Sequence, residues 1–310
     1  MNSGSVIEVS SLTRRYGDIT AVDDISLSVT QGEMFGLIGP NGAGKSTLFK
    51  LMLGLIAPSA GEIRVHGVLI DGPEFRAVRR RIGYLPESFV TYDNLTGLEV
   101  LRLFADLKQV PRNSCAALLA RVGLQDAAGR RVSGYSKGMR QRLGFAQALL
   151  GKPDLIFLDE PTNGLDPQGI HDFYDILRQV QTDGATVILT SHILAEIQER
   201  ADRLMILQNG RIAAQGTLAQ LRRQRTMPSV IEVTLPPDQQ ARVQDELARV
   251  AGVQMTVSGG LSRIACSPAE KVAVLELLFS LKGTVQQIAI HEPSLEDLFL
   301  GYGGQHADGN

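Results

Sequence analysis

The residues best suited to chemistry begin with the segment GPNGAGKST at 39–47, which fits the pattern GxxxxGKS/T. The apolar run MFGLI precedes it and the helical pattern TLFKLMLG follows it, which is the strand–loop–helix context that the pattern requires. Glycines let backbone N–H groups point inward at an anion, and the helix N-terminus adds its dipole. Lys45 would reach the β- and γ-phosphates of a nucleotide, Ser46 would bind Mg²⁺, and Thr47 would reach the α-phosphate. A turn that merely opens a helix has no use for the adjacent Lys-Ser-Thr. We therefore predict a phosphate-binding loop made of Gly39, Pro40, Asn41, Gly42, Ala43, Gly44, Lys45, Ser46 and Thr47.

Two adjacent carboxylates end an apolar run in LIFLDEPT at 155–162. Successive strand residues point to opposite sides, so the two acids should have different roles. Asp159 would hold Mg²⁺, and Glu160 would orient and deprotonate an attacking water. His192 directly follows the run TVILTS, at the carboxyl edge of the sheet, where it would contact the γ-phosphate. The alternatives are a pair of solvated acids and a structural histidine.

Two further segments are suited to contact rather than to catalysis. Tyr16 lies upstream of the phosphate loop, where an exposed ring would stack on adenine, although a tyrosine packed on a sheet edge is an equally good interpretation. The segment YSKGMRQR at 135–142 has no apolar face of its own, yet it leads into the helical run LGFAQALLG. Ser136 can cap that helix and Gly138 allows close approach to its backbone, so this segment should touch a partner.

The elements that must position these residues alternate in type along the first two-thirds of the chain. Four continuous apolar runs are typical of strands buried on both faces, and the helical patterns between them favour a largely parallel α/β sheet. VIEVSSL and DISLSV predict antiparallel edge strands packed onto this P-loop core. Three helical patterns and no strand pattern occupy about 88–150, which predicts an all-α insert. The strand runs are MFGLI (34–38), IGYL (82–85), LIFLD (155–159) and TVILTS (186–191).

A change in composition separates a second domain from the first. The polar, basic stretch LRRQRTMPS at 221–229 is typical of a linker, so the first domain should span 1–224. The pattern over 228–300 is β-α-β-β-α-β, which predicts a small ferredoxin-like α+β domain closed by a short helix at SLEDLFLGY. Residues 301–310 should form a disordered tail. This second domain would regulate, stabilise a dimer, dock an accessory protein or serve only for packing.

Composition narrows the class of protein. A chain of 310 residues can bury a sizeable core in about two domains, and a net charge of −2 gives no case for nucleic-acid binding. Two distant cysteines outside any metal-ligand spacing indicate a reduced compartment. The N-terminus lacks the pattern of a signal peptide, and no apolar run approaches the ~20 residues of a membrane span.

The order of phosphate loop, YSKGM, LIFLDE, GLD and His192 resembles the ATP-binding-cassette (ABC) ATPases over about residues 5–222. The resemblance implies ATP and Mg²⁺ as cofactors, with Tyr16 stacked on adenine. It places Glu87, in YLPES, near Mg²⁺ at the glutamine-loop position, and Asp166 in a loop that crosses to another subunit. It also implies a signature motif, which closes over the γ-phosphate of ATP held by that subunit and comprises Ser136, Lys137, Gly138 and Met139.

The resemblance also implies partners. One phosphate loop and one signature per chain imply a homodimer with two ATP at its interface, bound peripherally to permease subunits at the cytoplasmic face of the inner membrane. Lys137, Met139 and Glu87 depart from the commonest family residues, the first two toward the exporter-type branch. Longer segments, including IHEPSLEDLF, look like the ATPase of the nitrous-oxide-reductase maturation transporter, a copper-processing system with a periplasmic accessory protein.

Four other functions are alternatives to that interpretation. The ATPase of a drug or lipid exporter is the first alternative, because PSLEDLF also occurs there. A non-transport ABC ATPase acting on ribosomes or DNA usually has two cassettes or long coiled coils, and this chain shows neither. A GTPase would need a guanine-reading NKxD-type motif, and a small-molecule kinase would have no use for YSKGM.

Overall fold

The computed structural model of the chain describes residues 4–198, 200–224, 228–250, 252–258, 261–267, 269–280, 285 and 287–291. The chain divides into two compact units, residues 1–218 and 219–310. The sequence-based boundary at 224 falls at the end of helix α8 (Leu218–Gln224), whereas the division between the units comes near its start. The expected closing helix at SLEDLFLGY and the tail at 301–310 lie outside the described residues.

A six-stranded sheet forms the core of the first unit, with strand order β10-β9-β3-β8-β7-β6. Neighbouring strands from β9 to β6 run parallel, and β10 pairs antiparallel with β9. Every residue of β3, β7 and β8 is buried, as expected for strands that helices cover on both faces. The predicted parallel α/β core is therefore confirmed. The strands are β3 (Met34–Ile38), β6 (Ile82–Leu85), β7 (Leu155–Leu158), β8 (Thr186–Ser191), β9 (Arg203–Gln208) and β10 (Arg211–Gly216).

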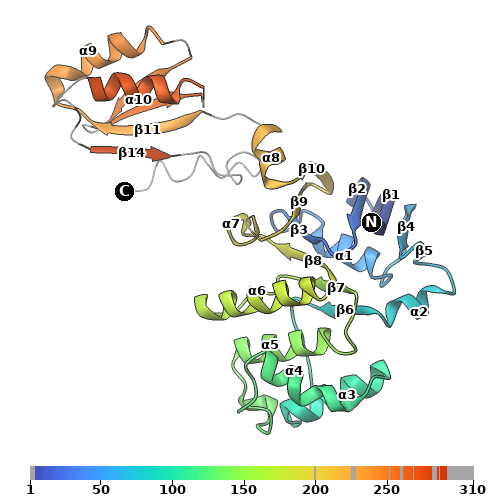
Figure 1. Ribbon diagram of the computed structural model, residues 1–310. Helices are drawn as coiled ribbons and strands as arrows, with labels where there is room; N and C mark the ends of the chain where they lie inside the picture. Colours follow the sequence, from blue (N-terminus) through green and yellow to red (C-terminus); the bar gives the residue numbers. More distant parts are fainter. Residues whose placement is uncertain are drawn as a thin grey trace. The chain divides into compact units, whose positions relative to one another are not determined.

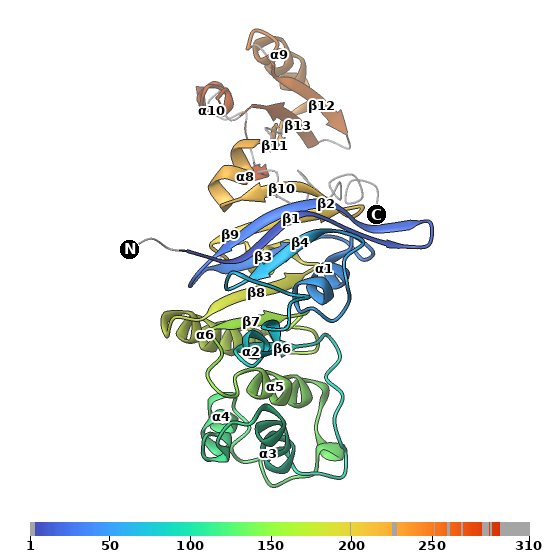
Figure 2. The same ribbon diagram turned by 90° about the vertical axis from the view of Figure 1, so that its right-hand side faces the viewer.

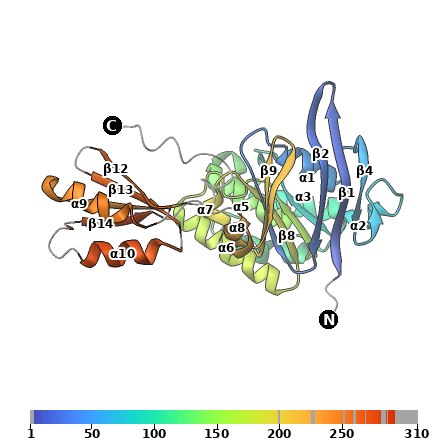
Figure 3. The ribbon, with the colours of Figure 1, turned by 90° about the horizontal axis from the view of Figure 1, so that it is seen from above.

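A separate antiparallel sheet of order β2-β1-β4-β5 packs onto this core, and its three longer strands lie side by side in Figures 2 and 3. The long hairpin of β1 (Ser5–Tyr16) and β2 (Ile19–Thr30) confirms the two expected strands. Two strands that were not expected from the sequence, β4 (Ala60–Val65) and β5 (Val68–Leu69), extend this sheet.

The insert at 88–150 is helical, as expected, and lies at one end of the first unit (Figure 1). It contains α3 (Gly97–Lys108), α4 (Cys115–Arg121) and α5 (Lys137–Ala148). A capping box between Thr96 and Glu99 fixes the start of α3. The remaining helices of the unit are α1 (Lys45–Met52), α2 (Phe75–Arg79), α6 (Pro167–Thr182) and α7 (Leu194–Ile197), with short 3₁₀ turns at Arg112–Ser114 and Val132–Gly134.

The second unit has the predicted β-α-β-β-α-β order, and its sheet order β12-β13-β11-β14 is that of a ferredoxin-like fold. Alternate residues of β11 are buried, and they form one apolar cluster with residues of α9 and α10, so both helices cover the same face of the sheet (Figure 1). The elements are β11 (Ser229–Thr234), α9 (Pro237–Leu247), β12 (Gln254–Ser258), β13 (Leu261–Cys266), α10 (Lys271–Ser280) and β14 (Gln287–His291).

Candidate active site

The phosphate loop connects the end of β3 to the start of α1, as the sequence predicts. Two of its glycines are required by close backbone contacts. A Cβ at Gly39 would lie 2.3 Å from the carbonyl oxygen of Leu207, and one at Gly44, whose φ is +104°, would lie 2.3 Å from that of Ala21. All nine predicted loop residues except Gly39 line one cavity of about 460 Å³, together with Ala21, Glu87, Glu160, Asn163 and His192.

Lys45 lies inside this site rather than in solvent. Its side chain is buried, and Nζ donates to the carbonyl oxygens of Gly39 at 2.6 Å and Pro40 at 3.3 Å. The same Nζ lies 3.6 Å from Oε1 of Glu160, so the lysine of the loop after β3 and the acid after β7 form a buried ion pair. A phosphate entering the cavity would compete with these oxygens for the ammonium group.

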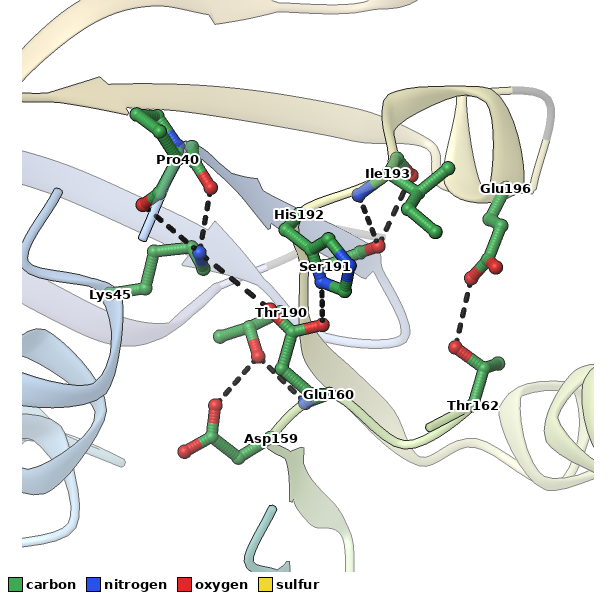
Figure 4. A network of polar contacts seen from close by, with 11 residues as sticks. Pro40, Lys45, Asp159, Glu160, Thr162, Thr190, Ser191, His192, Ile193 and Glu196 are labelled. Atoms are coloured by element: carbon green, nitrogen blue, oxygen red, sulfur yellow. Dashed lines mark hydrogen bonds and ion pairs between the residues drawn. The ribbon is translucent and has the colours of Figure 1, made fainter. Parts of the chain in front are cut away.

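Glu160 is the centre of the polar network in Figure 4. Its Oε2 lies 2.7 Å from Nδ1 of His192, which follows β8, so the structure brings these two predicted catalytic residues together. Glu160 has a φ of +47°, in the left-handed region, because the chain turns sharply where β7 ends. This turn separates the directions of Glu160 and its neighbour Asp159, as the expectation of different roles requires.

Sequence reasoning missed two side chains that hold this turn. Thr190, near the end of β8, donates from Oγ1 to Oδ1 of Asp159 at 2.7 Å and accepts from the backbone N–H of Glu160 at 2.8 Å. Gln141 of α5 donates to the carbonyl oxygen of Pro161 at 3.0 Å. Thr190 is one of three hydroxyl residues in the buried strand β8, and nothing in the sequence distinguishes it from the other two. Gln141 likewise gave no signal.

The electrostatics of the cavity suit a divalent cation. Burial raises the pKa of Asp159 above its ordinary value, the hydrogen bond from Thr190 opposes this, and the charges of Glu87 and Glu160 raise the pKa further. Three carboxylates against the one ammonium of Lys45 leave an excess of negative charge. Ser46 and Glu87 line the cavity, and Asp159 lies close enough to Glu87 for their charges to interact. Carboxylate and hydroxyl oxygens are the donors that Mg²⁺ prefers, so the chemistry of these residues fits the predicted metal.

Tyr16 is exposed and lies outside the lining of the phosphate cavity. It ends β1 with its side chain 44% exposed, and the guanidinium of Arg14 lies 4.5 Å from the ring centroid. The ring is therefore accessible for stacking. Tyr16 does not line the phosphate cavity, although Ala21, five residues later, does. Adenine stacking by Tyr16 stays a prediction.

The four signature residues lie apart from the phosphate loop. Ser136 caps α5 by accepting from the N–H of Met139 at 3.2 Å, as predicted. Asp166 caps α6 in the same way, accepting from the N–H of Gly169 at 2.9 Å. A second cavity, of about 540 Å³, is lined by Ser136, Lys137, Gly138, Met139 and Asp166 among others, and it shares no lining residue with the phosphate cavity.

Comparison with known proteins agrees with this geometry. The family model described as ABC transporter matches residues 22–163. The chain is 35% identical to a daunorubicin/doxorubicin resistance ATP-binding protein of Streptomyces peucetius, over 97% of this chain and 93% of that protein. It is also 35% identical to a Nod factor export ATP-binding protein of Ralstonia nicotianae, over 98% of this chain and 96% of that protein.

A solved structure shows the same fold. It is a dimeric, post-hydrolysis ATP-binding cassette bound to ADP and Pi, 26% identical, with a TM-score of 0.63 over 68% of this chain and 98% of that one. The fold, the phosphate cavity and the two full-length relatives agree, and the chain belongs to the ABC transporter family as an ATP-binding subunit that hydrolyses ATP.

Proposed function

We propose that this ATPase powers an exporter, and that two copies bind two ATP molecules between them while permease subunits move the cargo. The proposal of a dimer rests on the separation between the phosphate cavity and the cavity at the signature residues. Within one chain, the phosphate cavity and the cavity at the signature residues have no lining residue in common, so the signature of a second chain would complete each site. The dimeric relative bound to ADP and Pi supports the same arrangement.

The proposed mechanism assigns each step to a residue of the cavity. Lys45 leaves the carbonyl oxygens of Gly39 and Pro40 to bind the β- and γ-phosphates. Glu160 orients a water and accepts its proton, while His192, 2.7 Å from its carboxylate, holds that carboxylate and contacts the γ-phosphate. Ser46, Asp159 and Glu87 would hold Mg²⁺, which when bound would supply positive charge beside the phosphate oxygens. Ser136 of the second chain would then cover the γ-phosphate from the opposite side.

ATP binding would drive transport because only the closed dimer completes the sites. A ligand shifts a conformational equilibrium only by its differential affinity for the two states. Two nucleotides, each contacted by both chains, bind the closed state more tightly than the open one. Hydrolysis removes that difference in affinity, and the dimer reopens.

A groove beside the insert is suited to a permease helix. It measures about 530 Å³, and its apolar lining comes from β6, α3 and the segment after Glu87. Val90 is 83% exposed and Leu107 71% exposed at this groove, and large exposed apolar side chains at a concave surface are typical of a binding site. Within the described part of the chain, no helix combines the length and the apolar composition needed to cross a membrane. We propose that this groove attaches the subunit to its permease at the cytoplasmic face of the inner membrane.

For the cargo, export of a drug-like or lipid-like molecule is supported better than maturation of nitrous oxide reductase. The two full-length relatives are named for daunorubicin/doxorubicin resistance and for Nod factor export. The copper-maturation system rests only on the similarity of sequence segments such as IHEPSLEDLF, part of which lies outside the described residues. It is the second candidate.

The experiment is purification of tagged Glu160→Gln protein with ATP, in mild detergent, from its own host, followed by mass spectrometry of the co-purifying chains. A multi-span permease alone supports the drug or lipid exporter. A permease together with a periplasmic accessory protein supports the maturation system instead. Recovery of ribosomal or DNA-repair proteins without a membrane protein would overturn the transport function.

A further inference from the structure

We infer that Thr190 is a positioning residue for hydrolysis, whose hydroxyl sets the directions of both Asp159 and Glu160. The inference rests on the proposed roles of these two acids. One hydroxyl serves both: it donates to Oδ1 of Asp159 at 2.7 Å and accepts from the N–H of Glu160 at 2.8 Å (Figure 4). Thr190 has no exposed surface, so water cannot replace either contact.

The need for such a residue follows from the way β7 ends. The parallel pairing of β7 with β8 stops at Leu158, opposite Leu189. Glu160 then adopts a φ of +47°, which costs a non-glycine residue about 1 kcal/mol or more. Because β7 has ended, the backbone N–H of Glu160 donates to the side chain of Thr190 on β8 instead of to a backbone carbonyl of that strand. Thr190 thereby stabilises the turn that aims the Glu160 carboxylate at Lys45 and His192.

The same hydroxyl also restricts Asp159. The hydrogen bond that Thr190 donates to Oδ1 restricts the rotation of the Asp159 carboxylate. Ordering a metal-binding carboxylate through a neighbouring hydroxyl is the usual task of such an outer contact. Loss of Thr190 should therefore weaken two functions at once, the attack of water at Glu160 and the binding of Mg²⁺ at Asp159.

Thr186 provides a matched control on the same strand. It lies four residues earlier, on the same face of β8, and it is equally buried. Its hydroxyl accepts from the backbone N–H of Gly32 at 2.9 Å, so it also loses one buried contact on substitution. It lies at the amino end of β8, away from the phosphate cavity.

The test compares Thr190→Val, Thr190→Ser and Thr186→Val in the full chain, with wild type and Glu160→Gln as references. ATP hydrolysis gives kcat and KM, a fluorescent ATP analogue gives Kd with Mg²⁺ and with EDTA, and thermal unfolding gives Tm. Thr190→Val should lower kcat roughly 10- to 100-fold at saturating ATP and Mg²⁺. It should also reduce the Mg²⁺-dependent gain in nucleotide affinity at least about threefold. Thr190→Ser should restore both, and Thr186→Val should lower Tm alone.

Three results would overturn the inference. Thr190→Val could turn over at the wild-type rate, Thr190→Ser could be as slow as Thr190→Val, or Thr186→Val could lose the same fraction of kcat. If Glu160→Gln is inactive while any of these holds, the proposed catalytic site stands and only the role of Thr190 fails. A fully active Glu160→Gln would overturn both.

Discussion

Removing the negative charge of Glu160 should stop hydrolysis while strengthening ATP binding. Glu160→Gln keeps the size of the side chain but cannot accept a proton from water. A general base contributes about 10²- to 10⁴-fold to a rate, so kcat should fall by at least about 100-fold, or roughly 3 kcal/mol in the barrier. A change of this size is easily separated from the effect of a weakened structure.

The expected gain in affinity for ATP comes from removing the ion pair between Glu160 and Lys45. At 3.6 Å, Coulomb's law with an effective dielectric of about 20 gives about 5 kcal/mol before desolvation. Most of that energy is offset by the cost of burying the two charges. We therefore expect the ion pair between Glu160 and Lys45 to weaken ATP binding by about 1.4 kcal/mol. The substitution also removes repulsion between the carboxylate and the phosphates. We therefore expect Kd for ATP to fall about tenfold.

The assay pairs steady-state hydrolysis with equilibrium binding of ATP on the same preparation. Glu33→Gln is the matched control, because Glu33 is as buried as Glu160 and is paired with Arg203 at 3.2 Å, outside the phosphate cavity. It should lower stability and leave kcat and Kd close to wild type. A Glu160→Gln protein that hydrolyses ATP within threefold of wild type, or binds it more weakly, would refute the reasoning.

Two further predictions concern the dimer and stability. Ser136→Arg should bind ATP with the wild-type Kd as a monomer yet show no ATP-dependent dimer by light scattering, and normal dimerisation would contradict the two-chain site. Burial lowers the pKa of Lys108 from 10.5 to about 8, so between these values the unfolded chain binds more protons and stability should rise with pH. Wild type should therefore gain about 2 kcal/mol over Lys108→Met between pH 7.5 and 10.5 in urea unfolding, and a constant difference would contradict the assignment.

Much of the fold could be predicted because its signals are local. The strands β3, β7 and β8 are continuous apolar runs, and such runs are recognisable when both faces are buried. In contrast, β4 has the mixed sequence AGEIRV, in which only the isoleucine and the valine are buried. It is a strand because it pairs with β1. Pairing between distant segments has no signature in a single segment.

The same distinction applies to the site. The phosphate loop could be recognised because its motif requires particular residue types at fixed spacing, and the structure places its residues around one cavity with Glu160 and His192. The contacts of Thr190 were not, because they depend on where β7 ends beside β8. The position of Lys45 against Glu160 was equally inaccessible, since 115 residues separate them and only the sheet order brings them together.

The separation of the two cavities has a genetic consequence. Lys45→Ala and Ser136→Arg damage different cavities of one chain, so in the proposed dimer a cell carrying either allele alone would have no intact site. In a mixed dimer, one site combines both defects and the other has a wild-type phosphate loop facing a wild-type signature. The two alleles should therefore complement each other when expressed together. Two alleles within one cavity, such as Lys45→Ala and Glu160→Gln, leave every mixed site defective and should fail to complement.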